Sequence, residues 1–222
     1  MSNSSSKVDE YPTVSIEDGY EGKGVKLTTC RTSSLADMVK KPIAAGNLFI
    51  GQFNATDALT GNAMKATKFG YALSFASKPI RLEGWYKYKA GETFTDKNMK
   101  VLPDRHDFGT IYAVLYDNHD AQGNAIMLYG DNVQTSPQVV ALALVGETHD
   151  DNGKIAIGNT DQWTHFSVAF DYDTYGKTID PVKLKNGGYS LAIVCSSSTC
   201  GADFMGAIGS TLWVDSFKII CE

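Results

Sequence analysis

Hydrophobic and polar residues alternate with a period of two over most of the chain, in short runs separated by glycine, asparagine and aspartate. Such runs are typical of β-strands. The predicted strands are Gly24–Thr32, Asn47–Phe53, Ile80–Tyr88, Thr110–Tyr116, Ala125–Tyr129, Val139–Val145, Trp163–Tyr172, Tyr189–Cys195 and Thr211–Cys221. A single short helix is predicted at Leu35–Lys41, before Pro42. Many short strands with almost no helix predict an all-β fold, a single antiparallel β-sandwich or closed barrel.

The alternation also predicts which side chains face the core, because successive side chains of a strand point to opposite sides. Ile80–Tyr88 has an apolar core face made of Ile80, Leu82, Gly84, Tyr86 and Tyr88, which leaves Arg81, Glu83, Trp85 and Lys87 facing outward. The same rule places Tyr112, Trp163 and His165 outward on their strands. A sheet that holds these strands would have a polar and aromatic outer face.

Such a face suits a sugar, because aromatic rings stack on its C–H surface and polar groups bond to its hydroxyls. The predicted ligand is an oligosaccharide or glycan. We expect stacking from Trp85 and Tyr112, and polar contacts from Arg81, Lys87, Asp107, His165 and Asp203. The alternative is an ordinary solvated face with scattered aromatic residues. An adhesion or assembly module whose outer face binds a protein is a further alternative.

Composition narrows the class of protein. A chain of 222 residues with 43% hydrophobic and 20% charged residues can bury a sizeable core, which excludes a disordered chain. A net charge of −5 gives no sign of a nucleic-acid partner or an anionic membrane. No apolar run is long enough to span a membrane. Residues 1–12 are a polar, serine-rich segment without a signal peptide, expected to be a linker or flexible tail, and 13–222 form the predicted single domain.

No catalytic motif is present: the chain lacks GxSxG, HExxH and a P-loop. A glycoside hydrolase would need two carboxylates, which could come from Glu83, Asp107, Glu147 and Asp203. The four histidines are far apart in sequence, so a histidine metal site is not expected. We expect no cofactor, although a structural Ca²⁺ held by Asp215 with Glu17 or Asp18 is conceivable.

Four cysteines bear on the redox environment. Cys195 and Cys200 bracket a short loop, and their spacing predicts a disulfide. Cys30 and Cys221 lie in the first and last predicted strands and are a weaker candidate for a second one. An even number of paired cysteines favours an exported protein. Buried thiols in a cytosolic protein are the alternative, while zinc would need closer cysteine pairs or a nearby histidine.

The C-terminal third resembles a known family. Ser196–Ser198 followed by Gly201–Asp215 is similar to the signature of the putative carbohydrate metabolism domain family. Leu48–Phe53, Gly84–Gly91 and Asp107–Tyr116 also resemble segments of that family. The resemblance extends from about residue 47 to the end of the chain.

This resemblance implies a jelly-roll β-sandwich similar to carbohydrate-binding modules. It also implies an exported, often lipid-anchored protein of Gram-negative gut bacteria that use glycans, in the periplasm or at the outer-membrane surface, often behind an Ig-like domain. It supplies no catalytic residue. The glycines at 201, 206 and 209 predict a tight loop, which either presents backbone amides and Asp203 to a ligand or is only a demanding turn.

Overall fold

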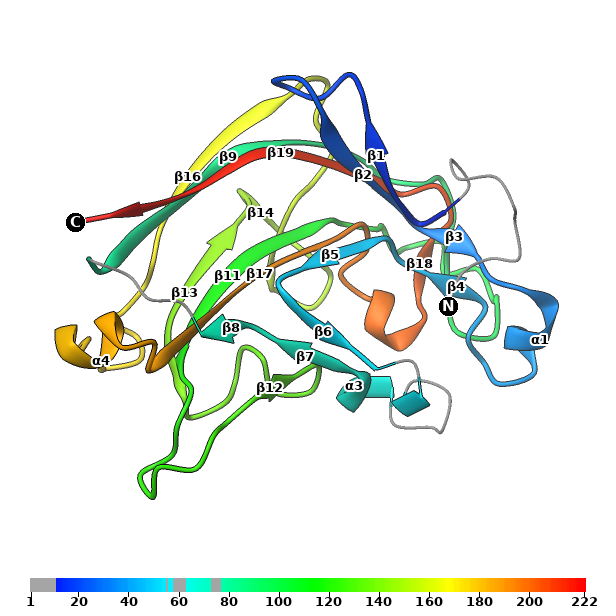
Figure 1. The fold of residues 1–222 in the computed structure, drawn as a ribbon. Helices are drawn as coiled ribbons and strands as arrows, with labels where there is room; N and C mark the ends of the chain where they lie inside the picture. The colour runs from blue at the N-terminus through cyan, green and yellow to red at the C-terminus, as the bar shows by residue number, and fades with distance from the viewer. Residues whose placement is uncertain (1–10, 55, 58–62, 73–76) are drawn as a thin grey trace.

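The chain folds into two antiparallel sheets packed face to face. The computed structural model describes residues 11–54, 56–57, 63–72 and 77–222. The first sheet has the order β1 (Thr13–Ile16), β2 (Gly24–Thr28), β19 (Thr211–Cys221), β9 (Pro79–Lys89) and β16 (Thr164–Ala169). The second has the order β13 (Val139–Val145), β11 (Thr110–Asp117), β17 (Tyr189–Ser196) and β5 (Asn47–Phe49), with β8 (Tyr71–Ala72) also paired to β17. Figure 1 shows the first sheet arching over the second.

The strand order identifies the type of sandwich. In chain order, the eight main strands are β2, β5, β9, β11, β13, β16, β17 and β19. The first sheet then contains the first, eighth, third and sixth strands, and the second contains the second, seventh, fourth and fifth. This interleaving between two four-stranded arrays is the jelly-roll topology. The fold class predicted from the alternation and from the family resemblance is confirmed.

A third layer covers the far side of the second sheet. It is a small sheet with the order β12 (Leu128–Tyr129), β7 (Thr67–Phe69) and β6 (Gly51–Phe53), and it lies below the second sheet in Figure 1. Phe69 and Leu128 of this layer pack with Val114 and Tyr116 of β11 in one hydrophobic cluster. The Tyr116 hydroxyl also donates a hydrogen bond to the Phe69 carbonyl oxygen at 2.7 Å. The second sheet is therefore buried on both faces.

The shorter elements surround the two large sheets, with α3 packed on the third layer beside β7 and β12. They are α1 (Ser34–Asp37), α3 (Ala63–Ala66), α4 (Pro181–Lys185), a 3-10 turn (Gly201–Asp203), and the strand pairs β3 (Cys30–Arg31) with β4 (Ile43–Ala44), β10 (Phe94–Thr95) with β18 (Gly206–Ala207), and β14 (Thr148–His149) with β15 (Ile155–Ala156). The Asp180 side chain caps α4 by accepting hydrogen bonds from the amides of Val182 and Lys183. Among the described residues, no helix is long and apolar enough to cross a membrane.

The main core lies between the two large sheets, where the predicted alternation holds. Leu82, Tyr86 and Tyr88 of β9 are buried against the second sheet, while Arg81, Trp85 and Lys87 are only partly buried on the opposite face. This burial confirms the orientation predicted for β9. Each fully buried aliphatic side chain in the core contributes about 1.5–3 kcal/mol relative to exposure.

A bulge in β19 reverses its inward set of residues. Leu212 and Val214 face the core before it, whereas Phe217 and Ile219 pack on the core after it. The pairing with β9 shifts between Asp215 and Lys218, and Ser216 has a φ of 54°. An extra residue in one strand turns the following side chains to the other side.

Two sequence predictions fail in this fold. Tyr112 does face away from the inter-sheet core, but it is 6% exposed because residues of the third layer and its flanking loops cover that face of β11. The predicted disulfide between Cys195 and Cys200 is wrong, since all four cysteines are free thiols. Cys195 points from β17 into the core, whereas Cys200 lies beyond the strand and faces the Arg105 guanidinium. The export argument drawn from paired cysteines therefore does not hold.

The predicted tail, 1–12, lies almost entirely outside the described residues. Its last residue, Pro12, accepts a hydrogen bond from the Thr28 amide, which begins the pairing of β1 with β2. The helix predicted at Leu35–Lys41 is present as the single turn α1.

Candidate functional site

Aromatic and basic side chains gather on the outer face of the first sheet. We call this set the aromatic face; its residues are Tyr20, Trp85, Lys87, Trp163, His165 and Trp213. The strand register explains the grouping: His165 of β16 and Asp215 of β19 lie on either side of Trp85 in β9. Side chains paired across neighbouring strands lie about 5 Å apart, so three strands supply one continuous surface.

Trp85 is the centre of the aromatic face. The Tyr20 ring stacks on it with a centroid distance of 3.7 Å and an interplanar angle of 12°. His165 lies 5.0 Å from it on the next strand, and Trp163 meets Tyr20 edge to face at 6.4 Å. Offset stacking and edge-to-face contacts of this kind contribute about 0.5–1.5 kcal/mol each. One ring face of Trp85 is therefore already occupied, and Tyr20, at 44% exposure, is more exposed than any of the three tryptophans of the cluster.

The loop between β1 and β2 carries Tyr20 across the sheet. Asp215, beside the β19 bulge, accepts a hydrogen bond from the Glu21 amide at 2.9 Å through its Oδ2. A Cβ on Gly19 would lie 2.5 Å from the same oxygen, so only glycine permits this close approach. Asp215, a candidate calcium ligand in the sequence, thus anchors the loop that places Tyr20 on Trp85.

Lys87 lies between two tryptophans. Its Nζ is 4.6 Å from the ring centroid of Trp213, the residue paired with it on β19, and 5.9 Å from that of Trp163. A cation over an aromatic ring contributes about 0.5–1 kcal/mol at an exposed site. The ammonium group therefore holds the two indoles in place and leaves a positive charge beside the stacked rings.

A polar group continues the same face along β9. The Arg81 guanidinium donates to the Ser167 hydroxyl at 2.8 Å, and that hydroxyl donates to a Glu83 carboxylate oxygen at 2.7 Å. Arg81 is thus on the predicted face, but its guanidinium is already hydrogen-bonded to Ser167 of β16. Of the predicted sugar contacts, the structure brings Trp85, Lys87 and His165 together and places Arg81 farther along the strand.

Asp107 lies elsewhere, in a buried network beneath the glycine-rich signature. It is 3% exposed, and its carboxylate accepts hydrogen bonds from the Ser198 and Ser210 hydroxyls at 2.7 and 2.8 Å and from the Ala207 amide at 2.8 Å. Burial raises the pKa of Asp107, and these hydrogen bonds oppose the rise. The Asp107 carboxylate is therefore buried inside the loop and not exposed on a surface that a glycan could reach, contrary to the expected orientation.

The serine triplet of the signature serves the same structural role. The Ser197 hydroxyl contacts that of Thr29 at 2.8 Å and accepts from the Gly46 amide at 2.9 Å, while the Ser197 carbonyl accepts from the Tyr88 hydroxyl. Gly206 has a φ of 154°, and a Cβ there would lie 2.6 Å from the Ser198 Oγ. Because the serines and the glycine pack around each other, the signature builds a tight buried turn. Asp203 is exposed on the adjacent 3-10 turn, apart from the aromatic face.

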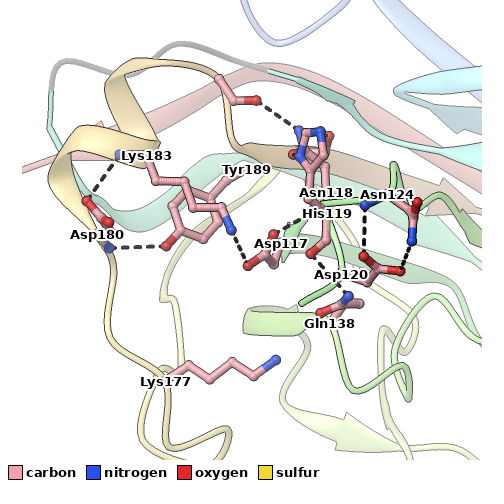
Figure 2. Close-up of polar contacts among 12 residues, drawn as sticks. Asp117, Asn118, His119, Asp120, Asn124, Gln138, Lys177, Asp180, Lys183 and Tyr189 are labelled. Carbon is pink, nitrogen blue, oxygen red and sulfur yellow. Dashed lines mark hydrogen bonds and ion pairs between the residues drawn. The ribbon is translucent and has the colours of Figure 1, made fainter. Parts of the chain in front are cut away.

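A second polar cluster lies near α4, at the far end of the second sheet. Figure 2 shows Lys183 of α4 reaching Asp117 at the end of β11, with an Nζ–Oδ2 distance of 2.5 Å. The Asn118 Nδ2 donates to the Ser190 hydroxyl at 3.2 Å, and the Asn118 Oδ1 accepts from His119 Nδ1 at 2.7 Å. The Asp180 amide donates to the Tyr189 hydroxyl. These groups bond to each other, so the cluster attaches α4 to the sheet.

A polar pocket of about 420 Å³ opens beside β16, on the inner side of the first sheet. Tyr86 lines it from β9, Glu147 and Thr148 from the segment that leads into β14, and Asp161 and Gln162 from the segment before β16. Of the four acids considered for hydrolysis, only Glu147 reaches this pocket. Glu83 is bonded to Ser167, Asp107 is buried, and Asp203 lies on the 3-10 turn.

No metal centre is apparent in the part of the chain that the structure describes: nowhere in it do three histidine, cysteine or acidic side chains gather as ligands. Calcium binding by Asp215 with Glu17 or Asp18 stays a prediction.

The model of the putative carbohydrate metabolism domain matches residues 1–220. The chain belongs to that family. Two solved structures are similar to this family member over nearly its whole length. A putative glycoside hydrolase from Bacteroides thetaiotaomicron VPI-5482 is 39% identical over 99% of this chain, with a TM-score of 0.86. A putative glycoside hydrolase from Bacteroides vulgatus ATCC 8482 is 40% identical over 96% of it, with a TM-score of 0.82.

The chain spans 59% of the length of the first of these proteins and 79% of the second. No curated protein matches it.

Three aromatic-face residues were absent from the predicted contacts: Tyr20, Trp163 and Trp213. Alternation does place Trp163 outward, beside His165, and Trp213 shares the side of Asp215 on β19. Tyr20 gives no such signal, because it lies in a loop whose path depends on the contact between Glu21 and Asp215.

Proposed function

We propose that this domain binds a glycan non-catalytically through its aromatic face. The observation that carries the proposal is the exposed Tyr20 ring stacked on Trp85, with Trp163 at its edge. The C–H surface of a sugar ring can stack on Tyr20, while Lys87 and His165 bond to its hydroxyls. Membership of a carbohydrate-related family supports the same ligand class.

The affinity expected of such a face is modest. Each stacked ring or hydroxyl contact contributes only about 1 kcal/mol after water is displaced. A few such contacts correspond to a Kd between millimolar and micromolar. Trp85 acts as the base on which Tyr20 rests, rather than as the ring that meets the sugar.

A glycan array followed by calorimetry tests this function. Trp163→Ala and Tyr20→Ala should each weaken binding by about fivefold, the effect of roughly 1 kcal/mol, without loss of folding, because both side chains lie on the outer surface. Phe53→Ala is the matched control, since Phe53 is an aromatic residue of 56% exposure on β6, in the third layer. Equal affinity in all four proteins would contradict the assignment of the site.

Glycoside hydrolysis is the second candidate. Two observations favour it: both similar structures are of putative glycoside hydrolases, and Glu147 and Asp161 line one pocket. Two carboxylates on opposite sides of a glycosidic bond are the usual requirement. Release of reducing sugar that disappears in Glu147→Gln or Asp161→Asn would support hydrolysis, and its absence with bound glycans would support the binding function.

The cellular location forms part of the proposal. We place the domain outside the cytoplasm, in the periplasm or at the outer-membrane surface, where glycans are captured. Support comes from the family resemblance alone. Fractionation of cells that express the whole protein would test it.

A further inference from the structure

The pocket beside β16 is lined by the hydroxyl of Tyr86, which has no hydrogen-bond partner among the described residues. Tyr86 is 7% exposed, and its ring packs against Phe166 in the core at a centroid distance of 6.1 Å. Within the described part of the chain, its hydroxyl makes no hydrogen bond, although Tyr86 lines the pocket. A polar group that lines a pocket without a protein partner is free to bond to a ligand or to water.

One wall of this pocket, 159–160, is hydrogen-bonded to β9 and to Ala90 directly after it. The Asn159 Oδ1 accepts from the Ala90 amide at 2.6 Å, and the Thr160 Oγ1 accepts from the Tyr88 amide at 2.9 Å. The Thr160 amide in turn donates to the Tyr88 carbonyl at 2.9 Å. These bonds attach the residues directly before Asp161 and Gln162 to the end of β9.

The charged residues that line the pocket are all acidic. Glu147 and Asp161 supply two carboxylates, which form no hydrogen bond or ion pair with any described residue, and no lysine or arginine lines the pocket. Burial, together with the nearby Glu147 charge, raises the pKa of Tyr86, which places the phenol hydroxyl within the field of that carboxylate. A ligand that fits must therefore offer hydrogen-bond donors and carry no negative charge.

We propose that the pocket lined by Tyr86, Glu147 and Asp161 binds one residue of an uncharged saccharide and rejects acidic sugars. The carboxylates accept hydrogen bonds from sugar hydroxyls, and the Tyr86 hydroxyl gains its missing partner. A volume of about 420 Å³ lies within the range of small-ligand sites, roughly 300–1,000 Å³. The choice of a sugar rests on the proposed function. The site itself is distinct from the aromatic face, since Tyr86 and Trp85 point to opposite sides of β9.

Amide NMR titrations at pH 7 with methyl glucoside, methyl galactoside, glucuronic acid and galacturonic acid test the proposal. The neutral glycosides should shift the amides of 158–162, whereas the uronic acids at equal concentration should not. Tyr86→Phe should weaken neutral-sugar binding roughly fivefold to tenfold, the effect of one hydrogen bond, without lowering Tm. Glu147→Gln should reduce the difference in affinity between neutral glycosides and uronic acids.

Tyr88→Phe is the matched control. Tyr88 also faces inward from β9, but its hydroxyl already donates to the Ser197 carbonyl at 3.2 Å. Removal of the Tyr88 hydroxyl should lower Tm and leave the affinity for neutral sugars unchanged. A lower Tm in Tyr86→Phe with unaltered binding would show a purely structural tyrosine and overturn the proposal.

The outcomes separate this site from the proposed function. Neutral-sugar binding that survives Trp163→Ala and falls in Tyr86→Phe supports the pocket. Glycan binding that falls in Trp163→Ala, with no shift at 158–162 for any sugar, overturns the pocket and leaves the proposed function intact. Uronic acids that shift the same amides as strongly as neutral glycosides overturn the charge selectivity. Absence of binding to every glycan overturns both proposals.

Discussion

The outer faces of the two large sheets carry similar side chains but differ in their surroundings. On the first sheet, Trp85 lies on β9 with the Tyr20 ring stacked on it and His165 beside it. On the second sheet, Tyr112 and Tyr116 lie on β11 beneath the layer formed by β6, β7 and β12. Each strand alternates correctly, and the aromatic residues point away from the inter-sheet core in both. Whether an outward aromatic residue is a binding residue or a core residue therefore depends on segments that lie far away in sequence.

The largest expected difference between the two faces is in stability. Leu128 of β12 is fully buried against the second sheet. Leu128→Ala should lower the free energy of unfolding by about 2–5 kcal/mol, through lost burial and the cavity that remains. Denaturant titration measures the change, with Tyr20→Ala on the first sheet as the control, expected to cost less than about 1 kcal/mol. A loss below about 1 kcal/mol at Leu128 would show that the third layer is not part of the core.

Asp107→Asn tests whether a residue expected on the glycan face belongs to the buried structure. An amide cannot accept all the hydrogen bonds that the carboxylate receives from Ser198, Ala207 and Ser210. The free energy of unfolding should fall by about 1–3 kcal/mol, while glycan binding by the folded protein should be unchanged. Weaker binding without loss of stability would return Asp107 to the glycan site.

The wild type and the Asp107→Asn variant should also differ in how their stability depends on pH. Because burial raises the pKa of Asp107 in the folded state, the folded protein binds the proton more tightly than the unfolded chain does. The stability of the wild type relative to Asp107→Asn should therefore decrease as pH rises from about 3.9, the unfolded value, through the folded pKa. Denaturation curves measured across this range would show the change, and a constant difference would argue against the raised pKa.

Tyr116→Phe gives a smaller effect on the covered face. The Tyr116 hydroxyl donates to the Phe69 carbonyl, so its removal leaves a buried acceptor unpaired. We expect a loss of about 1 kcal/mol in the free energy of unfolding. Tyr20→Phe on the open face should change stability by no more than about 0.5 kcal/mol. Equal effects at the two positions would remove the contrast between the faces.

Trp85→Ala should have a small effect on stability and a clear effect on the loop between β1 and β2. Trp85 packs on the outside of the first sheet, and its loss should cost about 1 kcal/mol or less. Without this platform, Tyr20 loses its stacking partner, so limited proteolysis between β1 and β2 should be faster. Glycan binding should weaken as it does in Tyr20→Ala. Unaltered proteolysis together with unaltered binding would show that Tyr20 holds its place independently of Trp85.

The alternation of residues by itself determined the long strands of the two large sheets, the inward face of β9 and the all-β class, but it missed most of the two- to four-residue strands and joined β5 and β6 into one. It even records the β19 bulge, because the inward apolar residues change from Leu212 and Val214 to Phe217 and Ile219. Local signals of this kind succeed because a strand has a strict period of two and one face of each sheet must be buried.

Only the tertiary structure decided which polar and aromatic residues form a site. Three strands had to pair in one register to bring Trp85, His165 and Trp213 together, and a loop had to cross the sheet to add Tyr20. The third layer had to fold over β11 to bury Tyr112. The spacing of Cys195 and Cys200 suggested a disulfide. Cys195, however, faces the core from within β17, whereas Cys200 lies after the strand has ended, and both thiols are free. Contacts between distant segments set exposure and proximity, and the local period carries no information about them.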